Sequence, residues 1–101
     1  MNIERKPVVE CYELQQAIEN HFDLEHFNLV EVFFPTAENG TYEDLCIDDY
    51  SVEQAYHEVE LYTAWGYSEQ YIENLKMKAQ IIEYLHQLLP NEEMLIVSLI
   101  W

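Results

Sequence analysis

The stretch MLIVSLIW, residues 94–101, decides the fold that we expect for this chain. Ser98 is the only polar residue in it, so the alternation of apolar and polar side chains that marks a half-exposed strand is missing. A continuous apolar run of this length is typical of a strand that is covered on both faces. We therefore expect residues 94–101 to form the central strand of a small sheet, with helices packed against it.

The flanking strands are expected upstream, at residues 28–34 and 42–47. The first segment is rich in Val and Phe and is followed by Pro35, and the second alternates between apolar and polar side chains. Asn39-Gly40 is a turn signal between them. The sequence therefore predicts a hairpin whose strands flank the central one, in a small, mainly antiparallel three-stranded sheet.

A first helix is expected after Pro7, because apolar side chains recur there at intervals of three and four residues. This spacing places them on one face, which we expect to pack into the core. The face consists of Cys11, Leu14, Ala17, Ile18, His21 and Phe22.

Two further helices are expected between residues 51 and 90. Ser51 with Gln54 forms a capping box, and Gly66 is placed to end this helix. Ser68 caps the next helix, which Pro90 terminates. The inner stripes are Val52, Ala55, Tyr56, Val59, Tyr62 and Thr63 in the second helix, and Ile72, Leu75, Ala79, Ile82, Leu85 and Leu89, widened by Ile81 and Leu88, in the third.

The element order is helix, strand, strand, helix, helix, strand, which indicates a single α+β domain over residues 1–101. Half of the residues are apolar, which is enough for a core and unlike a disordered acidic tail. No segment resembles a signal peptide or a membrane span, so we expect a cytoplasmic protein that does not contact membranes. Cys11 and Cys46 occupy apolar-patterned positions and are expected to be free and to act as small hydrophobic residues.

Charge is the most informative property of the composition. Twenty acids and four bases give a net charge of −16. The bases are Arg5, Lys6, Lys76 and Lys78, so residues 7–75 contain no Lys or Arg but hold sixteen of the twenty acids. Soluble domains usually mix both signs and keep a net charge of about 2–8 in magnitude. The excess favours a positively charged partner, although adaptation to high salt would produce the same composition.

The densest group of acids is Glu43, Asp44, Asp48, Asp49 and Glu53, at the junction between an expected strand and an expected helix. Acids near a helix N-terminus interact favourably with the helix dipole, typically by about 0.3–1 kcal/mol each. This effect accounts for Asp49 and Glu53 but not for Glu43 and Asp44. A calcium loop is the alternative, but the spacing is not that of an EF-hand and no Gly supplies its sharp turn.

The acidic character continues along the following helix. Glu53, His57 and Glu60 share one flank, with Glu58 beside them. Like charges one turn apart destabilise an isolated helix by a few tenths of a kcal/mol. Their repetition without an intervening Lys favours a functional face over one that is merely solvated.

Tyrosine is the second unusual feature, because six of the eight tyrosines lie in residues 42–71. We expect Tyr42 and Tyr50 to be exposed among the acids and Tyr67 to lie in a turn between helices. Tyrosine is common at interface anchors, and a surface of Tyr and acidic side chains suits a partner rich in Arg. The predicted partner-binding residues are Glu43, Asp44, Asp48, Asp49, Glu53, Glu58, Glu60, Tyr42, Tyr50 and Tyr67.

Motifs for catalysis and for cofactors are weak. His57-Glu58 begins like a zinc-protease motif, but Leu61 stands where the second His is needed. His21 and His26 lack the paired cysteine spacing of a zinc site. We therefore expect a protein that is not an enzyme and that carries no metal or other cofactor.

In its acid excess from Glu10 to Glu73, its short length and its tyrosines, the chain resembles the small acidic inhibitors of phages and mobile elements: anti-CRISPR, anti-restriction and uracil-glycosylase-inhibiting proteins. Several of those are DNA mimics that occupy the nucleic-acid groove of a host enzyme. The resemblance rests on composition, without a family motif. It implies an inhibitor of a basic nucleic-acid-binding protein, with a nucleic-acid-guided defence nuclease preferred, that does not bind nucleic acid itself.

Two alternatives stay open. One is an immunity protein or antitoxin that neutralises a basic nuclease toxin with the same surface. The other is an acidic adaptor or a self-associating protein, with residues 94–101 as the contact if that strand is an exposed edge. The sequence does not decide the oligomeric state.

Overall fold

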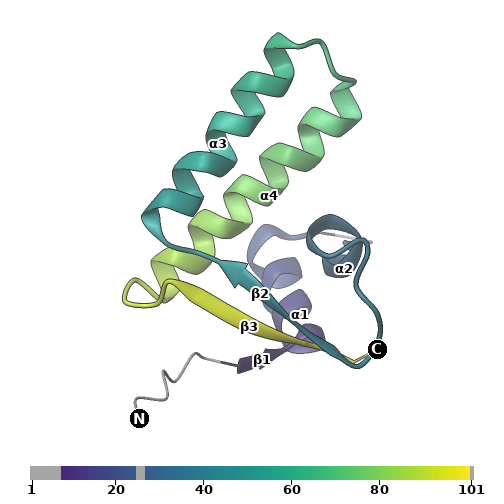
Figure 1. The fold of residues 1–101 in the computed structure, drawn as a ribbon, viewed down its shortest axis with the longest axis vertical. Helices are drawn as coiled ribbons and strands as arrows, with labels where there is room; N and C mark the ends of the chain where they lie inside the picture. Colours follow the sequence, from purple (N-terminus) through teal and green to yellow (C-terminus); the bar gives the residue numbers. More distant parts are fainter. Residues whose placement is uncertain (1–7, 25–26, 101) are drawn as a thin grey trace. The chain divides into compact units, whose positions relative to one another are not determined.

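The computed structural model describes residues 8–24 and 27–100. Its contacts divide into two compact units, which we call the sheet unit (Met1–Leu45 with Met94–Trp101) and the helical unit (Cys46–Glu93). Among the described residues there are four helices instead of the expected three, together with three strands, which confirms the α+β class. In chain order the elements are β1 (Val8–Glu10), α1 (Cys11–Phe22), α2 (Leu29–Phe33), β2 (Thr41–Cys46), α3 (Asp49–Ala64), α4 (Glu69–Leu88) and β3 (Met94–Leu99) (Figure 1).

The strands form one sheet in the order β1-β3-β2, so the central position expected for the last strand is confirmed. It is paired on both sides and is therefore not an exposed edge. β3 runs parallel to β1. It runs antiparallel to β2, because Gly40 N donates to Leu99 O at 2.6 Å near one end and Ile47 N donates to Glu93 O at 2.9 Å near the other. The expected antiparallel sheet is wrong in this respect: the sheet is mixed.

β1 occupies the sheet position that the sequence analysis gave to one strand of a hairpin. This strand is three residues long and pairs with β3 in a register that places Val9 opposite Val97. A strand this short, with a partner far along the chain, leaves no periodic pattern that a local reading detects. As a consequence the first helix begins at Cys11 and not directly after Pro7.

In the sheet unit, α1 lies against β1 and β3 (Figure 1). It buries Cys11, Leu14 and Ile18, as the sequence predicts. Ala17 and His21 share the spacing of the stripe but are exposed, so the covered face is narrower than the sequence indicates and His21 is not a core residue.

Residues 28–34 were expected to form a strand, and this prediction is wrong because Leu29–Phe33 is a short helix, α2. The Asn28 side chain caps it by accepting a hydrogen bond from Glu31 N at 3.1 Å. Leu29 is fully buried, and its backbone N–H donates to Gln15 Oε1 of α1 at 3.3 Å. Packing and capping outweigh the strand preference of the Val and Phe residues.

In the helical unit, α3 begins earlier than expected. The N-cap is Asp48 rather than Ser51: its Oδ1 accepts from Ser51 N at 2.9 Å and from the Ser51 hydroxyl at 2.5 Å. Ser51 is therefore the third residue of the first turn and not the start of a capping box with Gln54. The other predicted cap is confirmed, since Ser68 Oγ accepts from Tyr71 N at 3.3 Å at the start of α4.

Within this unit α3 packs along α4 (Figure 1). α4 buries much of its predicted stripe, although Leu88 is exposed. No residue of α3 is buried, so the inner stripe expected for the second helix is only partly covered. A helix that packs against one other helix covers a narrow strip of each surface, and side chains at the margins of that strip keep contact with solvent. The buried residues of α4 are Ile72, Ala79, Ile81, Ile82 and Leu85.

Candidate protein-interaction surface

The predicted partner-binding residues fall on both units. Tyr42, Glu43 and Asp44 belong to β2, in the sheet unit. On this strand the side chains alternate: Tyr42, Asp44 and Cys46 are exposed, whereas Glu43 is half-buried and Leu45 is buried. Tyr42 and Asp44 therefore share the exposed face of β2, and Glu43 does not. Cys46, expected to be free and to act as a small hydrophobic residue, is free but exposed; Cys11 is free as expected.

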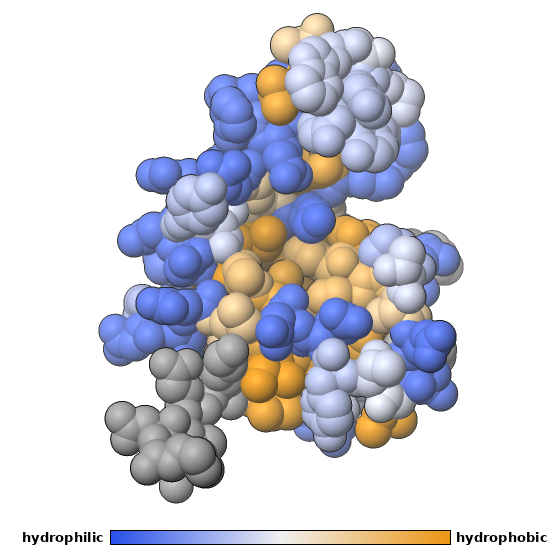
Figure 2. Space-filling view, viewed as in Figure 1, coloured by the Kyte–Doolittle hydropathy of each residue, from blue (hydrophilic) through white to orange (hydrophobic). Residues whose placement is uncertain are grey.

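In the helical unit the acids of α3 separate into two groups. Asp49, Glu53 and Glu60 lie within about 40° of one another around a helix of 3.6 residues per turn. With a rise of 1.5 Å per residue, Glu53 is about 6 Å and Glu60 about 16 Å along the axis from Asp49. All three are exposed, and we call them the acid row. Hydrophilic residues cover α3 along the left of Figure 2.

Glu58, expected beside this row, is placed about 140° around the helix from Glu53. It lies instead near Tyr62, one turn further along α3. The pKa of Tyr62 is raised, in decreasing order of effect, by Tyr71, by burial, by Tyr67 and by Glu58. Glu58 therefore belongs with the aromatic residues at the end of α3 and not with the acid row.

Two of the predicted acids are held by contacts within the helical unit. Asp48 is the N-cap described above, and the hydrogen bonds from the Ser51 hydroxyl and then from Ser51 N lower its pKa. Asp49 Oδ1 lies 2.8 Å from Nε2 of His86 on α4, although the Asp49 side chain remains 92% exposed. Nδ1 of His86 is buried without a hydrogen-bond partner among the described residues. Asp48 thus has a structural role, and Asp49 is partly engaged.

The turn between α3 and α4 carries an aromatic cluster that the sequence analysis did not identify as a unit. We call its members, Tyr62, Trp65, Tyr67 and Tyr71, the turn cluster. The ring of Tyr62 is the hub: it meets Trp65, Tyr67 and Tyr71 edge to face, with centroids at 5.2, 4.7 and 5.5 Å. Tyr67 also lies 5.1 Å from Tyr71 and 6.5 Å from Trp65. Trp65 is 60% exposed, Tyr67 48% and Tyr71 41%.

The backbone of the turn fixes this arrangement. Tyr67 N donates to Tyr62 O at 3.2 Å and Gly66 N donates to Thr63 O at 3.1 Å, the paired bonds of a Schellman motif. Gly66 has a φ of +80°, the left-handed conformation that the motif requires. Gly66 was predicted to end the helix, and this is confirmed. Of the cluster, only Tyr67 is among the partner-binding residues predicted from the sequence. The signal for Tyr62, Trp65 and Tyr71 was that all three lie within five positions of the helix-ending Gly66.

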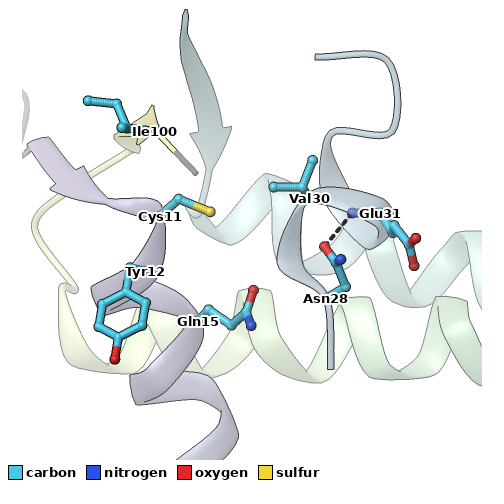
Figure 3. A pocket seen from close by; sticks show the side chains of 7 residues that line it. All are labelled: Cys11, Tyr12, Gln15, Asn28, Val30, Glu31 and Ile100. Atoms are coloured by element: carbon cyan, nitrogen blue, oxygen red, sulfur yellow. Dashed lines mark hydrogen bonds between the residues drawn. The ribbon is translucent and has the colours of Figure 1, made fainter. Parts of the chain in front are cut away.

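The sheet unit contains a pocket of about 360 Å³ between α1 and α2 (Figure 3). One of its polar groups links the two helices, since Gln15 Oε1 accepts from Leu29 N, and another, Asn28, caps α2. Burial raises the pKa of the Cys11 thiol, which keeps it protonated near neutral pH, whereas the thiolate is the reactive form. This pocket therefore lies at the contact between α1 and α2. Its lining consists of Cys11, Tyr12, Gln15, Asn28, Val30, Glu31 and Ile100.

Within residues 8–24 and 27–100, no three His, Cys, Asp or Glu side chains come together in a group that could hold a metal ion. The possible zinc ligand His26 lies outside the described residues. None of the described helices combines the length and the apolar character needed to cross a membrane. No protein-family model, curated protein sequence or solved structure matches this chain.

Proposed function

We propose that this protein is an inhibitor that binds the basic nucleic-acid-binding surface of another protein in place of DNA or RNA. The observation that carries the proposal is the acid row, Asp49, Glu53 and Glu60, exposed on one side of α3 in a segment without Lys or Arg. Duplex DNA carries one charge per roughly 1.7 Å of its axis, divided between two strands. Carboxylates one or two helical turns apart also form a line of negative charges, which the Lys and Arg side chains of a partner can contact.

The mechanism is competition. Lys and Arg side chains that otherwise bind phosphates form ion pairs with the exposed carboxylates, and the nucleic acid is excluded. A net charge of −16 also steers a basic partner toward the protein, so association is fast at low salt and slows as salt is added. Among basic nucleic-acid-binding proteins, a nucleic-acid-guided defence nuclease is the preferred target.

The test is affinity capture from a bacterial lysate in moderate salt, analysed by mass spectrometry. Two variants are compared with the wild type: E53Q/E60Q in the acid row, and E13Q/E38Q, which removes two exposed carboxylates of the sheet unit. Each double variant changes the net charge from −16 to −14, since it removes two of the twenty acids. Because the two variants have the same net charge, a difference in binding between them reports where the carboxylates lie and not how many there are. Both variants keep Asp49 and its contact with His86.

We expect the wild type and E13Q/E38Q to capture the same nucleic-acid-binding protein and to release it when DNA or guide RNA is added. Exposed ion pairs contribute about 0.2–1 kcal/mol each, so E53Q/E60Q should bind roughly two- to thirtyfold more weakly. If no nucleic-acid-binding protein is recovered, or if the two variants bind equally well, the proposal is wrong.

The second candidate is an immunity protein dedicated to one basic nuclease toxin. The turn cluster favours it, because exposed aromatic rings supply partner-specific anchors that charge alone does not. A dedicated immunity protein is expected to be encoded beside its toxin and to remain bound in the presence of excess DNA if it does not cover the active site. An unlinked target that DNA displaces completely would support the mimic instead.

A further inference from the structure

The turn cluster has more exposed aromatic surface than the helix end requires. A Schellman motif is usually accompanied by one apolar contact, between the residues in the places of Tyr62 and Tyr67. Their contact at 4.7 Å meets that need. Trp65 and Tyr71 pack against the same hub and remain 60% and 41% exposed, so the capping contact does not account for them.

The backbone positions that carry the rings are set by helices and a capped turn before any partner arrives. Tyr62 and Tyr71 belong to helices, and Trp65 is the C-cap of α3. The backbone of Tyr67 is held by the hydrogen bond from its N–H to Tyr62 O. Figure 2 shows residues of intermediate hydropathy, drawn near-white, gathered over this turn at the top right. A rigid group of rings binds a flat ligand with less loss of conformational freedom than mobile side chains do.

The electrostatic surroundings select a cation. Glu58 acts electrostatically on Tyr62, and Glu69 lies in the first turn of α4, two residues after Tyr67. Glu73, one turn further along α4, is in contact with Lys76 at 3.5 Å and is therefore partly neutralised. Aromatic faces attract cations through the ring quadrupole, and carboxylates beside them strengthen that attraction.

We propose that the turn cluster is a binding site for an arginine side chain of the partner, whose guanidinium group stacks on the exposed ring of Trp65 or of Tyr71. Arginine fits better than lysine because its group is planar and more weakly hydrated than an ammonium, and because it stacks on aromatic faces. The inference rests on the proposed function for the source of the arginine, a basic nucleic-acid-binding surface. The site itself is distinct from the acid row.

The experiment measures binding of oligo-arginine and oligo-lysine peptides of equal length and charge by calorimetry. Three proteins are compared: the wild type; W65L/Y71L, which keeps apolar side chains but removes two ring faces; and W65F/Y71F, which keeps rings. All of them retain Tyr67 and the helix end. In a separate W101F protein Trp65 is the only tryptophan, so its fluorescence reports binding at the turn.

A cation on an exposed aromatic face contributes about 0.5–1 kcal/mol, which corresponds to a two- to fivefold change in affinity for each arginine engaged. Because lysine gains part of the same contribution, the wild type and W65F/Y71F should prefer oligo-arginine by up to about this factor, and W65L/Y71L should bind both peptides equally. Trp65 emission should shift more with oligo-arginine than with oligo-lysine. Circular dichroism checks that W65L/Y71L keeps its helices. If the helices are lost, the inference is judged from the peptide preference of the wild type and from the Trp65 emission of W101F.

Equal binding of both peptides by the wild type, or an arginine preference that persists in W65L/Y71L, would overturn the inference. The proposed function is tested separately with E53Q/E60Q. If that variant weakens both peptides while neither is preferred, the acid row acts as proposed and the arginine site is wrong. If the arginine preference holds and E53Q/E60Q has no effect, the arginine site stands and the acid row has lost its support.

Discussion

The backbone N–H of Tyr67 donates to the carbonyl oxygen of Tyr62 at 3.2 Å, and the rings of the same two residues meet edge to face at 4.7 Å. One pair of residues therefore closes the end of α3 and forms the centre of the turn cluster. Any change that opens this backbone bond is expected to loosen the rings as well, which links the stability of the helical unit to the surface that we assign to partner binding.

Gly66→Ala should destabilise the protein by about 1–2 kcal/mol, because a side chain in the left-handed conformation is strained by about that amount. The cost comes from the backbone alone, since an added Cβ would meet nothing within 4 Å. Gly66→Asn should lose less, because asparagine tolerates this conformation. Urea denaturation measures the loss, and near-ultraviolet circular dichroism follows the rings. An alanine variant as stable as the wild type would show that the turn does not need a positive φ.

Asp48→Asn should change how stability depends on pH. Hydrogen bonds from Ser51 lower the pKa of Asp48 in the folded state, so its contribution is present above the unfolded pKa of about 3.9 and is lost as pH falls through the folded value. The difference in unfolding free energy between wild type and Asp48→Asn should be constant at neutral pH and shrink below about pH 4. This subtraction removes the general effect of protonating the other acids. A difference that does not change with pH would mean that the carboxylate is not held by Ser51.

Gln15→Ala should destabilise the joint between α1 and α2. Gln15 Oε1 accepts the hydrogen bond of Leu29 N, and Leu29 is fully buried, so truncation leaves a donor without its partner. A loss of about 1–3 kcal/mol is expected. Hydrogen exchange should show faster exchange of the Leu29 amide in the variant. Gln16→Ala, an exposed neighbour on α1, is the control and should have little effect.

Salt should raise the melting temperature, because it screens repulsion among the acids. The Debye length falls from about 30 Å at 0.01 M to about 10 Å at 0.1 M salt. For a domain of this size, each kcal/mol of repulsion relieved corresponds to roughly 4–8 °C. Calorimetry over this range measures the rise, which should be smaller for E53Q/E60Q. A melting temperature that is independent of salt would remove the physical basis for treating the acids as an uncompensated surface.

The two cysteines should react at different rates with a thiol reagent. Cys46 is exposed on β2, whereas Cys11 is buried and its pKa is raised by burial. The folded protein should show one fast-reacting thiol, and the second should react only when urea is added. Cys46→Ser should abolish the fast reaction. Two fast thiols in the folded protein would contradict the burial of Cys11.

The parts of the fold that the sequence predicts well are those fixed by long local patterns. α4 was recognised from a stripe and from the cap at Ser68, and β3 from a continuous apolar run, because both signals depend on neighbours in the chain. The misassigned segment at residues 28–34 had a β-type composition. Its helix depends on the burial of Leu29 and on Gln15 of another helix, contacts that no local window contains. The spacing of Asn28 and Glu31, an N-cap pattern, was the one local signal for it.

For the candidate site, the sequence identified the exposed acids and the shared flank of Glu53 and Glu60, but it put Glu58 beside them. The structure differs at Glu58, which acts on Tyr62 near the end of α3. The contact of Asp49 with His86 joins residues on two helices and could not be read from spacing. The sequence predicts Tyr62 as a core residue and therefore does not indicate the turn cluster. Within the unit, α3 packs against one helix and none of its residues is buried, which leaves these rings at the surface.

The strand order also has a consequence for how this chain folds. β3, the middle strand of the sheet, is separated from β1 and β2 by the whole helical unit. α3 and α4 are adjacent in sequence and can pair as soon as both are synthesised, whereas β1 and β2 have no strand between them until residues 94–99 are made. Local contacts form faster than distant ones. We therefore expect the helical unit to assemble first on the nascent chain and the sheet unit, which needs its last strand in the middle, to close afterwards.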